Sequence, residues 1–123
     1  MDLIAGTILI ENSEHHLKFL VNKTSKLFVT TYLSNEKTAL ATILDKLKSL
    51  TDFDIDHLEL VELTNSVYNG ENIPLYVFSY EGDDDERLMH LNDESGAYGW
   101  LSHKELKKTF EQVTIQGVPN FKN

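Results

Sequence analysis

Apolar residues recur along this chain with two different periods, and each period predicts its own kind of element. Residues 3–10 are apolar at nearly every position, which predicts a strand that is buried on both faces. Residues 17–21 follow after a short polar turn, and Leu17, Phe19 and Val21 would lie on one face of a second strand. We therefore expect the chain to open with two paired strands.

After a third strand, the apolar residues recur with the period of an α-helix. Leucine and isoleucine recur at steps of three and four residues from Leu40 to Leu50, and charged residues occupy the positions between them. Ser34 or Asn35 could cap the N-terminus of this helix, because both side chains can accept a hydrogen bond from a free backbone amide. The pattern predicts one amphipathic helix with an apolar stripe against a sheet.

The second half of the chain repeats the order of strands followed by a helix. Strand-like runs at 58–63 and 75–80 flank a turn signal at 69–72. After Trp100, Ser102 and Glu105 have the spacing of a capping box, which predicts a second helix. The buried stripe of that helix would consist of Leu106, Phe110 and Val113.

This order of elements differs from the regular alternation of a doubly wound parallel sheet. It favours an α+β fold, in which helices pack on a mixed β-sheet. The 123 residues contain no repeat and no Pro/Gly/Ser-rich linker, and 41% of them are hydrophobic. Since this length supports one packed core, we expect a single domain that spans residues 1–123.

Composition and charge exclude several classes of partner and chemistry. Eleven basic and 20 acidic residues give a formal net charge of −9, so we expect neither a nucleic acid nor a membrane partner. No run of about 18 uncharged apolar residues and no signal peptide is found, and we expect a cytoplasmic protein.

The absence of cysteine excludes disulfides, thiolate catalysis and cysteine zinc sites. No zinc-protease, serine-hydrolase or phosphate-loop motif occurs.

Several motifs and their order resemble the Nudix (MutT-like) family. The apolar runs at 5–10 and 17–21 look like the paired opening strands of that family. Residues 98–106, YGWLSHKEL, resemble its "W-hydrophobic-x-x-x-E-L" step into the last helix. The resemblance covers nearly the whole chain. It implies a Nudix-like α/β/α sandwich with a mixed β-sheet and two main helices.

The signature of that family is G-x5-E-x7-R-E-U-x-E-E-x-G-U, where U is aliphatic or aromatic, and its glutamates hold magnesium against a substrate diphosphate. Aligned without gaps, it falls on residues 31–53 of this chain, and only its apolar positions are matched. The charged positions of the signature fall on Lys37 (first glutamate), Asp45 (arginine), Lys46 (second glutamate), and Ser49 and Leu50 (glutamate pair).

Positions 46, 49 and 50 are three and four residues apart and would share one face of a helix. Magnesium requires oxygen ligands, which are usually carboxylates. An ammonium, a hydroxyl and a hydrocarbon side chain cannot supply such a site. We therefore interpret the signature as a degenerate Nudix box, assign no catalytic or metal-ligating residue, and expect no cofactor.

The favoured function is that of a catalytically degenerate Nudix-fold protein that binds a nucleotide-like small molecule or a partner. Lysines on the helix could contact a phosphate directly, without magnesium. The candidate ligand-binding residues are Lys37, Asp45, Lys46, Ser49 and Glu62. One alternative is an active Nudix pyrophosphohydrolase that binds Mg²⁺ through relocated carboxylates, which would be Glu36, Asp45, Glu59 or Glu62. The other alternative is a non-catalytic scaffold that forms a homodimer.

Overall fold

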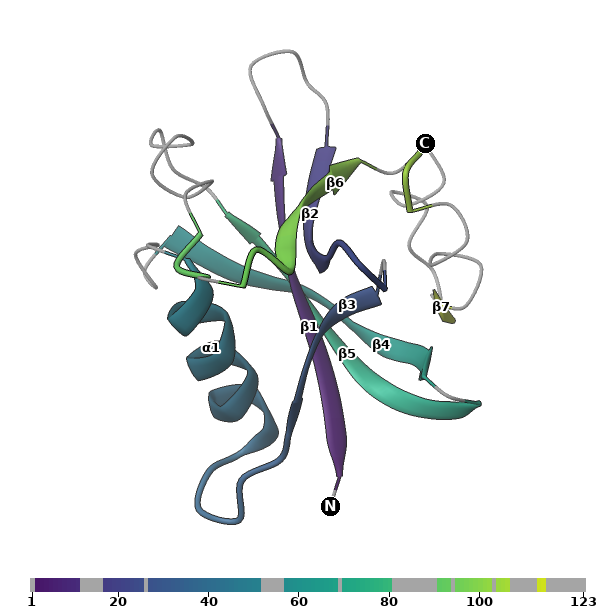
Figure 1. Cartoon of the computed structure of the whole chain (residues 1–123). Helices are drawn as coiled ribbons and strands as arrows, with labels where there is room; N and C mark the ends of the chain where they lie inside the picture. Colours follow the sequence, from purple (N-terminus) through teal and green to yellow (C-terminus); the bar gives the residue numbers. More distant parts are fainter. Residues whose placement is uncertain are drawn as a thin grey trace.

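In the described part of the computed structural model, a seven-stranded mixed sheet carries one α-helix on one of its faces (Figure 1). The structure describes residues 2–11, 17–25, 27–51, 57–68, 70–80, 91–93, 95–102, 104–106 and 113–114. The elements are β1 (Leu3–Glu11), β2 (Leu17–Asn22), β3 (Leu27–Tyr32), α1 (Ala39–Leu50), β4 (Leu58–Tyr68), β5 (Glu71–Tyr80), β6 (Tyr98–Ser102) and β7 (Val113–Thr114).

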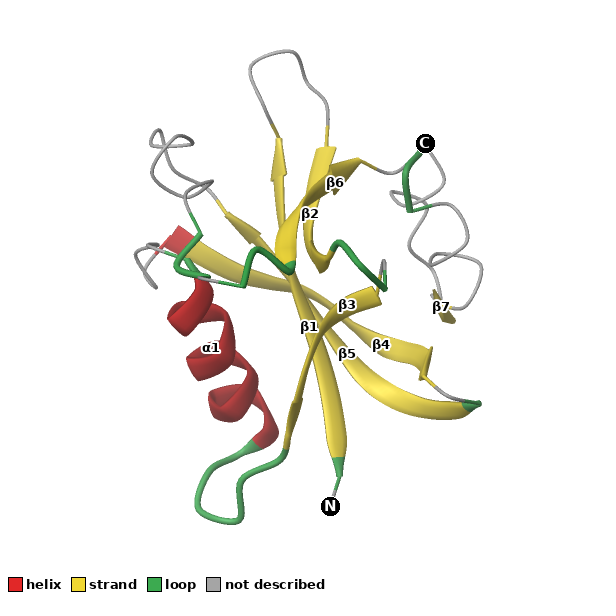
Figure 2. Cartoon of the chain, viewed as in Figure 1, coloured by secondary structure: helices red, strands yellow, loops and turns green. Residues whose placement is uncertain are grey.

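The strands lie in the order β6-β2-β3-β1-β5-β4-β7 across the sheet. The β1–β5 pair is parallel, and the other neighbouring strands are antiparallel. The opening pair is confirmed, since Leu9 of β1 lies opposite Phe19 of β2. A mixed sheet with a helix packed on it (Figure 2) agrees with the α+β class predicted from the sequence.

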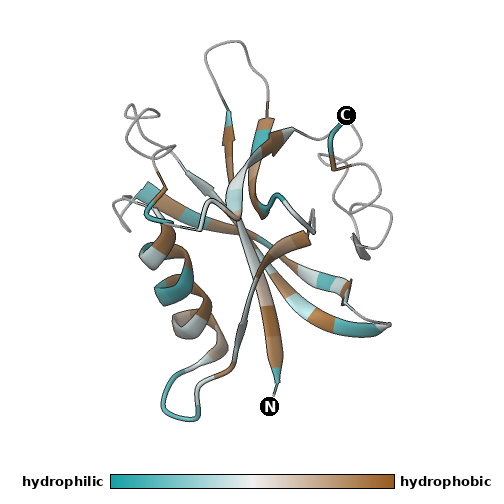
Figure 3. Ribbon diagram, viewed as in Figure 1, coloured by the Kyte–Doolittle hydropathy of each residue, from teal (hydrophilic) through white to brown (hydrophobic). Residues whose placement is uncertain are grey.

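Strand β1 lies inside the sheet and is buried on both faces, as its continuous apolar run predicts. Ile4 and Ile8 point into the core on the α1 side of the sheet, and Ala5 points into a second core on the other side. Residues of β2 also alternate between the two cores. Leu20 belongs to the first core and Phe19 to the second. Figure 3 shows the apolar character of these central strands.

Helix α1 is confirmed at its predicted place, but its N-cap differs from the prediction. Thr38 is the cap, and its Oγ1 accepts a hydrogen bond from the Ala41 amide at 3.1 Å. Neither Ser34 nor Asn35 has this role. The Ser34 hydroxyl instead accepts a hydrogen bond from the Glu36 amide at 3.2 Å, within the loop before the helix. Serine, asparagine and threonine are all good N-cap residues, so residue type alone does not select the cap. Thr38 is the cap because the helix that carries the sheet-facing stripe begins at the next residue, Ala39.

Replacing Thr38 with alanine should lower the free energy of unfolding by about 0.5–2 kcal/mol, because the Ala41 amide loses its acceptor. Urea denaturation followed by circular dichroism would measure the change. Asn35→Ala is the matched control, since Asn35 is an exposed cap candidate three positions earlier. An equal loss of stability in both variants would contradict the assignment of Thr38 as the cap.

The helix packs closely on the sheet because β1 has no side chain at Gly6. Ile43, Leu47 and Leu50 form the buried stripe of α1. A Cβ atom added at Gly6 would overlap Ile43 Cγ1 and approach Ile43 Cδ1 to 3.0 Å. This glycine therefore sets the distance between α1 and β1.

The prediction of two main helices is not supported, because the described residues contain one α-helix. The capping box itself forms: the Ser102 amide donates to Glu105 Oε1 at 3.0 Å, and the Ser102 hydroxyl accepts from the Glu105 amide at 3.4 Å. Val113, however, belongs to β7 and lies opposite Ser66 of β4. Valine is favoured in strands, and this pairing satisfies backbone groups that a helix would satisfy internally. Phe110 lies outside the described residues.

The β4–β5 hairpin is confirmed and is longer than the two apolar runs that predicted it. Tyr68 lies opposite Glu71, so a two-residue loop joins the strands, and Gly70 there has a φ of +80°. The ladder contains one irregularity, a bulge between Leu60 and Glu62. In the described part of the chain, no helix has the length and apolar character needed to cross a membrane.

Candidate ligand site

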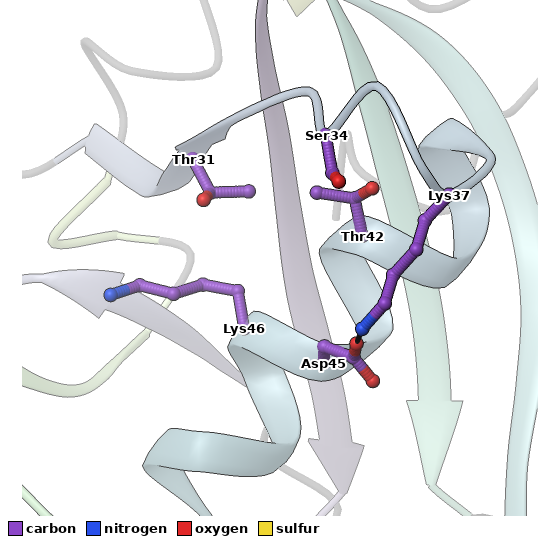
Figure 4. A pocket seen from close by; sticks show the side chains of 6 residues that line it. All are labelled: Thr31, Ser34, Lys37, Thr42, Asp45 and Lys46. Atoms are coloured by element: carbon purple, nitrogen blue, oxygen red, sulfur yellow. Dashed lines mark hydrogen bonds and ion pairs between the residues drawn. The ribbon is translucent and has the colours of Figure 1, made fainter.

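Three of the predicted ligand-binding residues, Lys37, Asp45 and Lys46, line one pocket beside α1 (Figure 4). The pocket is open to solvent and has a volume of about 320 Å³, at the small end of the range for ligand sites. The loop before α1 contributes Lys37, and the helix contributes the other two. The remaining lining residues carry hydroxyl groups and are Thr31, Ser34 and Thr42.

The period of α1 explains why these side chains meet. Thr42, Asp45 and Lys46 are three and four residues apart and project from one flank of the helix. Ile43 and Leu47 occupy the adjacent face and are fully buried against the sheet. The packing that buries the apolar stripe therefore turns this polar flank toward Thr31 at the end of β3.

Lys37 and Asp45 form an ion pair across one side of the pocket (Figure 4). Their side chains are 50% and 56% exposed, respectively, so solvent screens the pair and its contribution to stability is small. Its effect on the site is to neutralise both charges locally. Two lysines against one aspartate leave the pocket with one formal positive charge.

The remaining positive charge belongs to Lys46, which extends away from the ion pair (Figure 4). Its Nζ atom lies 5.7 Å from the centroid of the Tyr98 ring, a cation–π distance. Lys46 has no ion pair within the part of the chain that is described here. Its ammonium group therefore has hydrogen-bond donors that an anionic ligand could use.

Tyr98 is held at the start of β6 by the loop before it. The Asp93 carboxylate accepts hydrogen bonds from the Ser95 hydroxyl at 2.7 Å and from the Tyr98 amide at 3.0 Å. The Ser95 hydroxyl is the main cause that holds the pKa of Asp93 below its usual value, and the Tyr98 amide is the next. This loop fixes the backbone that presents the ring to Lys46.

The other two predicted ligand-binding residues, Ser49 and Glu62, lie outside the pocket. Ser49 is exposed on α1, and its hydroxyl donates a hydrogen bond to the Lys46 carbonyl at 2.6 Å. Glu62 lies opposite Val77 in the β4–β5 ladder, and Val77 belongs to the core on the sheet face away from α1. Directly paired strand residues share a face, so Glu62 also points away from the helix. The pocket lining includes neither residue.

Of the aligned glutamate positions 46, 49 and 50, position 50 faces the core, as the apolar stripe predicted for residues 40–50 implies. Leu50 is 5% exposed and belongs to the core under α1. It lies three residues after Leu47 and seven after Ile43, so it continues the sheet-facing stripe. The helix therefore presents only Lys46 and Ser49 at the aligned glutamate positions outside the core.

The carboxylates that a relocated metal site would need are separated. Glu59 lies opposite Ser79 and Glu62 opposite Val77, which places both on the face away from Asp45 of α1. Among the described residues, no group of three His, Asp or Glu side chains has an arrangement that could hold a metal ion.

Three lining residues received no ligand role from the sequence, and one of them, Ser34, was considered there only as a helix cap. Thr42 could have been found from the helical period, because it lies four residues before Lys46 on the predicted helix. Thr31 could not, since only the packing of β3 beside α1 brings it to the pocket.

The chain is similar in structure to a Nudix hydrolase from M. smegmatis, RenU, whose crystal structure it matches with a TM-score of 0.54. The match covers 98% of this chain and 78% of that chain, with 6% sequence identity. At this identity the similarity shows a Nudix-like fold and leaves the activity open. No family model matches the sequence, and no curated protein has significant sequence similarity to it.

Proposed function

We propose that this protein is a non-catalytic Nudix-like module that binds a small phosphorylated, nucleotide-like ligand without a divalent cation. The observation that carries the proposal is the position of Lys46 in the pocket. In the ungapped alignment with the family signature, this lysine occupies a glutamate position. A cationic side chain there repels magnesium and attracts a phosphate group directly.

The chemistry of the lining suits a phosphate group. The ammonium group of Lys46 donates strong hydrogen bonds to anionic oxygens, and the hydroxyls of Thr31 and Ser34 add neutral donors. The Thr42 hydroxyl already donates to the Thr38 carbonyl at 2.8 Å. The Lys37–Asp45 pair closes one side of the pocket and leaves Lys46 as the unpaired charge of the lining.

Tyr98 gives the site its apolar and aromatic part. Its ring faces the Lys46 ammonium. A bound phosphate would take over part of that contact, and the half-buried ring would then be available to a base or sugar next to the phosphate. This combination favours a nucleotide over inorganic phosphate alone.

The separated carboxylates disfavour the hydrolase alternative. Asp45 is paired with Lys37 on α1, whereas Glu59 and Glu62 point away from the helix. Among the described residues, neither Asp45 nor Glu36 belongs to a group of three acidic or histidine side chains that could hold a metal, so the ligand set that activates water or neutralises a leaving diphosphate is missing there.

The proposal predicts that Lys46→Ala weakens nucleotide binding about tenfold or more, because a charge-assisted hydrogen bond contributes about 1.5–3 kcal/mol. Isothermal titration with a panel of nucleoside mono- and diphosphates in EDTA would measure this loss. The matched control is Lys48→Ala, which removes the same charge from an exposed position of α1 outside the pocket.

Two results would contradict the proposed function, and a third would contradict the role of Lys46. One is turnover of a nucleoside diphosphate derivative with magnesium or manganese that disappears in Asp45→Ala, which would identify a hydrolase. The other is an absence of heat or thermal stabilisation across the nucleotide panel together with a concentration-dependent dimer, which would favour the scaffold. Equal affinities of Lys46→Ala and Lys48→Ala would remove Lys46 from the site.

A further inference from the structure

We infer that the outer edge of β4, from residue 58 to residue 64, binds an extended peptide in which basic and apolar residues alternate. The inner edge of β4 pairs with β5 over the whole strand. Its outer edge pairs with β7 only at Asn65 and Ser66. In the part of the chain that the structure describes, no strand accompanies β4 before those two residues, so its outward amide and carbonyl groups can accept another strand.

Large apolar side chains are exposed along this same run. Leu60 is 41% exposed, Val61 46% and Leu63 54%. The run also carries two charged residues, Glu59 and Glu62, so it combines an apolar surface with charges of the kind that limit pairing with another copy of the same edge. Three large apolar residues within four positions of an edge therefore indicate a surface that becomes covered.

The bulge at Val61 divides the run into an apolar face and an acidic face. Leu60 lies opposite Phe78 and Leu63 opposite Tyr76, and both partners pack on the α1 side of the sheet. Glu59 and Glu62 lie opposite Ser79 and Val77, respectively, and so point to the other side. Without the extra residue at the bulge, Glu62 would fall on the leucine face.

This division specifies the occupant. A strand added beside β4 would place alternate side chains next to Leu60 and Leu63 and the intervening ones next to Glu59 and Glu62. The first set must be apolar and the second lysine or arginine. A second copy of β4 fits poorly, because antiparallel self-pairing of residues 59–63 would bring two glutamates from each copy together, and each copy already carries a net charge of −9.

A short fluorescein-labelled peptide in which lysine alternates with isoleucine or valine tests the inference by fluorescence anisotropy. We expect saturable binding that weakens with salt. The Glu59→Gln/Glu62→Gln double variant should bind about tenfold more weakly and show a flatter salt dependence. Leu63→Thr should also weaken binding. Glu71→Gln is the control, because it removes an exposed charge at the far end of the hairpin and should leave the affinity unchanged.

Backbone pairing is tested separately by N-methylation of alternate peptide amides. One set of methylated positions points toward β4 and should abolish binding, whereas the other set points outward and should leave it intact. Equal binding of a peptide with glutamate in place of lysine, or equal behaviour of the two methylated peptides, would overturn the inference. A protein dimer that is strengthened by Glu59→Gln/Glu62→Gln and excludes the peptide would also overturn it, since a second copy would then be the occupant.

Discussion

Replacing Phe19 with alanine should lower the free energy of unfolding by about 3–5 kcal/mol, which is the largest loss that we expect from a single side chain. Phe19 is fully buried and is the largest of the side chains with under 2% exposure. It lies between Leu9 of β1 and Leu101 of β6, so its removal leaves a cavity where three strands meet. Domains of this size are commonly stable by about 5–15 kcal/mol, so the variant would lose a large share of its stability.

Urea denaturation monitored by circular dichroism and by tryptophan fluorescence would measure the change. Tyr32→Ala is the matched control, because it removes an aromatic ring that is 57% exposed at the end of β3. We expect the control to change the free energy of unfolding by about 0.5 kcal/mol or less. If the two variants lost similar amounts, Phe19 could not occupy the core position described here.

Gly6→Ala should lower the free energy of unfolding by about 1–3 kcal/mol, because the added methyl group meets the Ile43 side chain and pushes α1 away from β1. A double-mutant cycle with Ile43→Ala provides the sharper measurement. If the overlap is the cause, the double variant should be more stable than the sum of the two single losses predicts.

Gly99→Ala is the matched control for this experiment. The atoms nearest to a Cβ atom at Gly99 belong to the side chain of Lys23, which is exposed and can move aside. The same substitution in β6 should therefore have a small effect. A loss at Gly99 equal to that at Gly6 would mean that the backbone of either glycine, and not the contact with Ile43, determines the cost.

The strands and the helix α1 could be predicted because their burial follows local period. The unbroken apolar run of residues 3–10 indicated a strand covered on both sides, and the structure has two cores there. The parallel pairing of β1 with β5 could not be predicted in this way, since no local pattern specifies which distant strand becomes a neighbour.

Val113 shows where a local signal misleads. The capping box between Ser102 and Glu105 forms the expected hydrogen bonds, but these bonds specify one turn and not the length of a helix. Val113 has the right spacing for a helical stripe from Leu106. It pairs with Ser66 of β4 instead, because an edge strand offers backbone partners that a sequence pattern does not show.

The part of the candidate site that lies on or next to α1 could be predicted from the sequence. Asp45 and Lys46 are neighbours on α1, and Lys37 reaches them from the preceding loop. Glu62 was chosen as a residue that reaches the helix face, but the bulge at Val61 places it on the opposite face. The sequence does contain a hint of this bulge, because the alternation in LELVEL is interrupted at Val61.

The parallel contact between β1 and β5 also constrains the order in which the molecule can assemble. Ala5 pairs with Leu75, 70 positions later in the chain, and the register continues to Leu9 and Ser79. During synthesis on the ribosome, β1 emerges early and can meet β2 and β3, but its other edge stays open until β5 has been made. Closure of such a distant contact is slow, so the nascent chain exposes an apolar strand edge that a chaperone can protect.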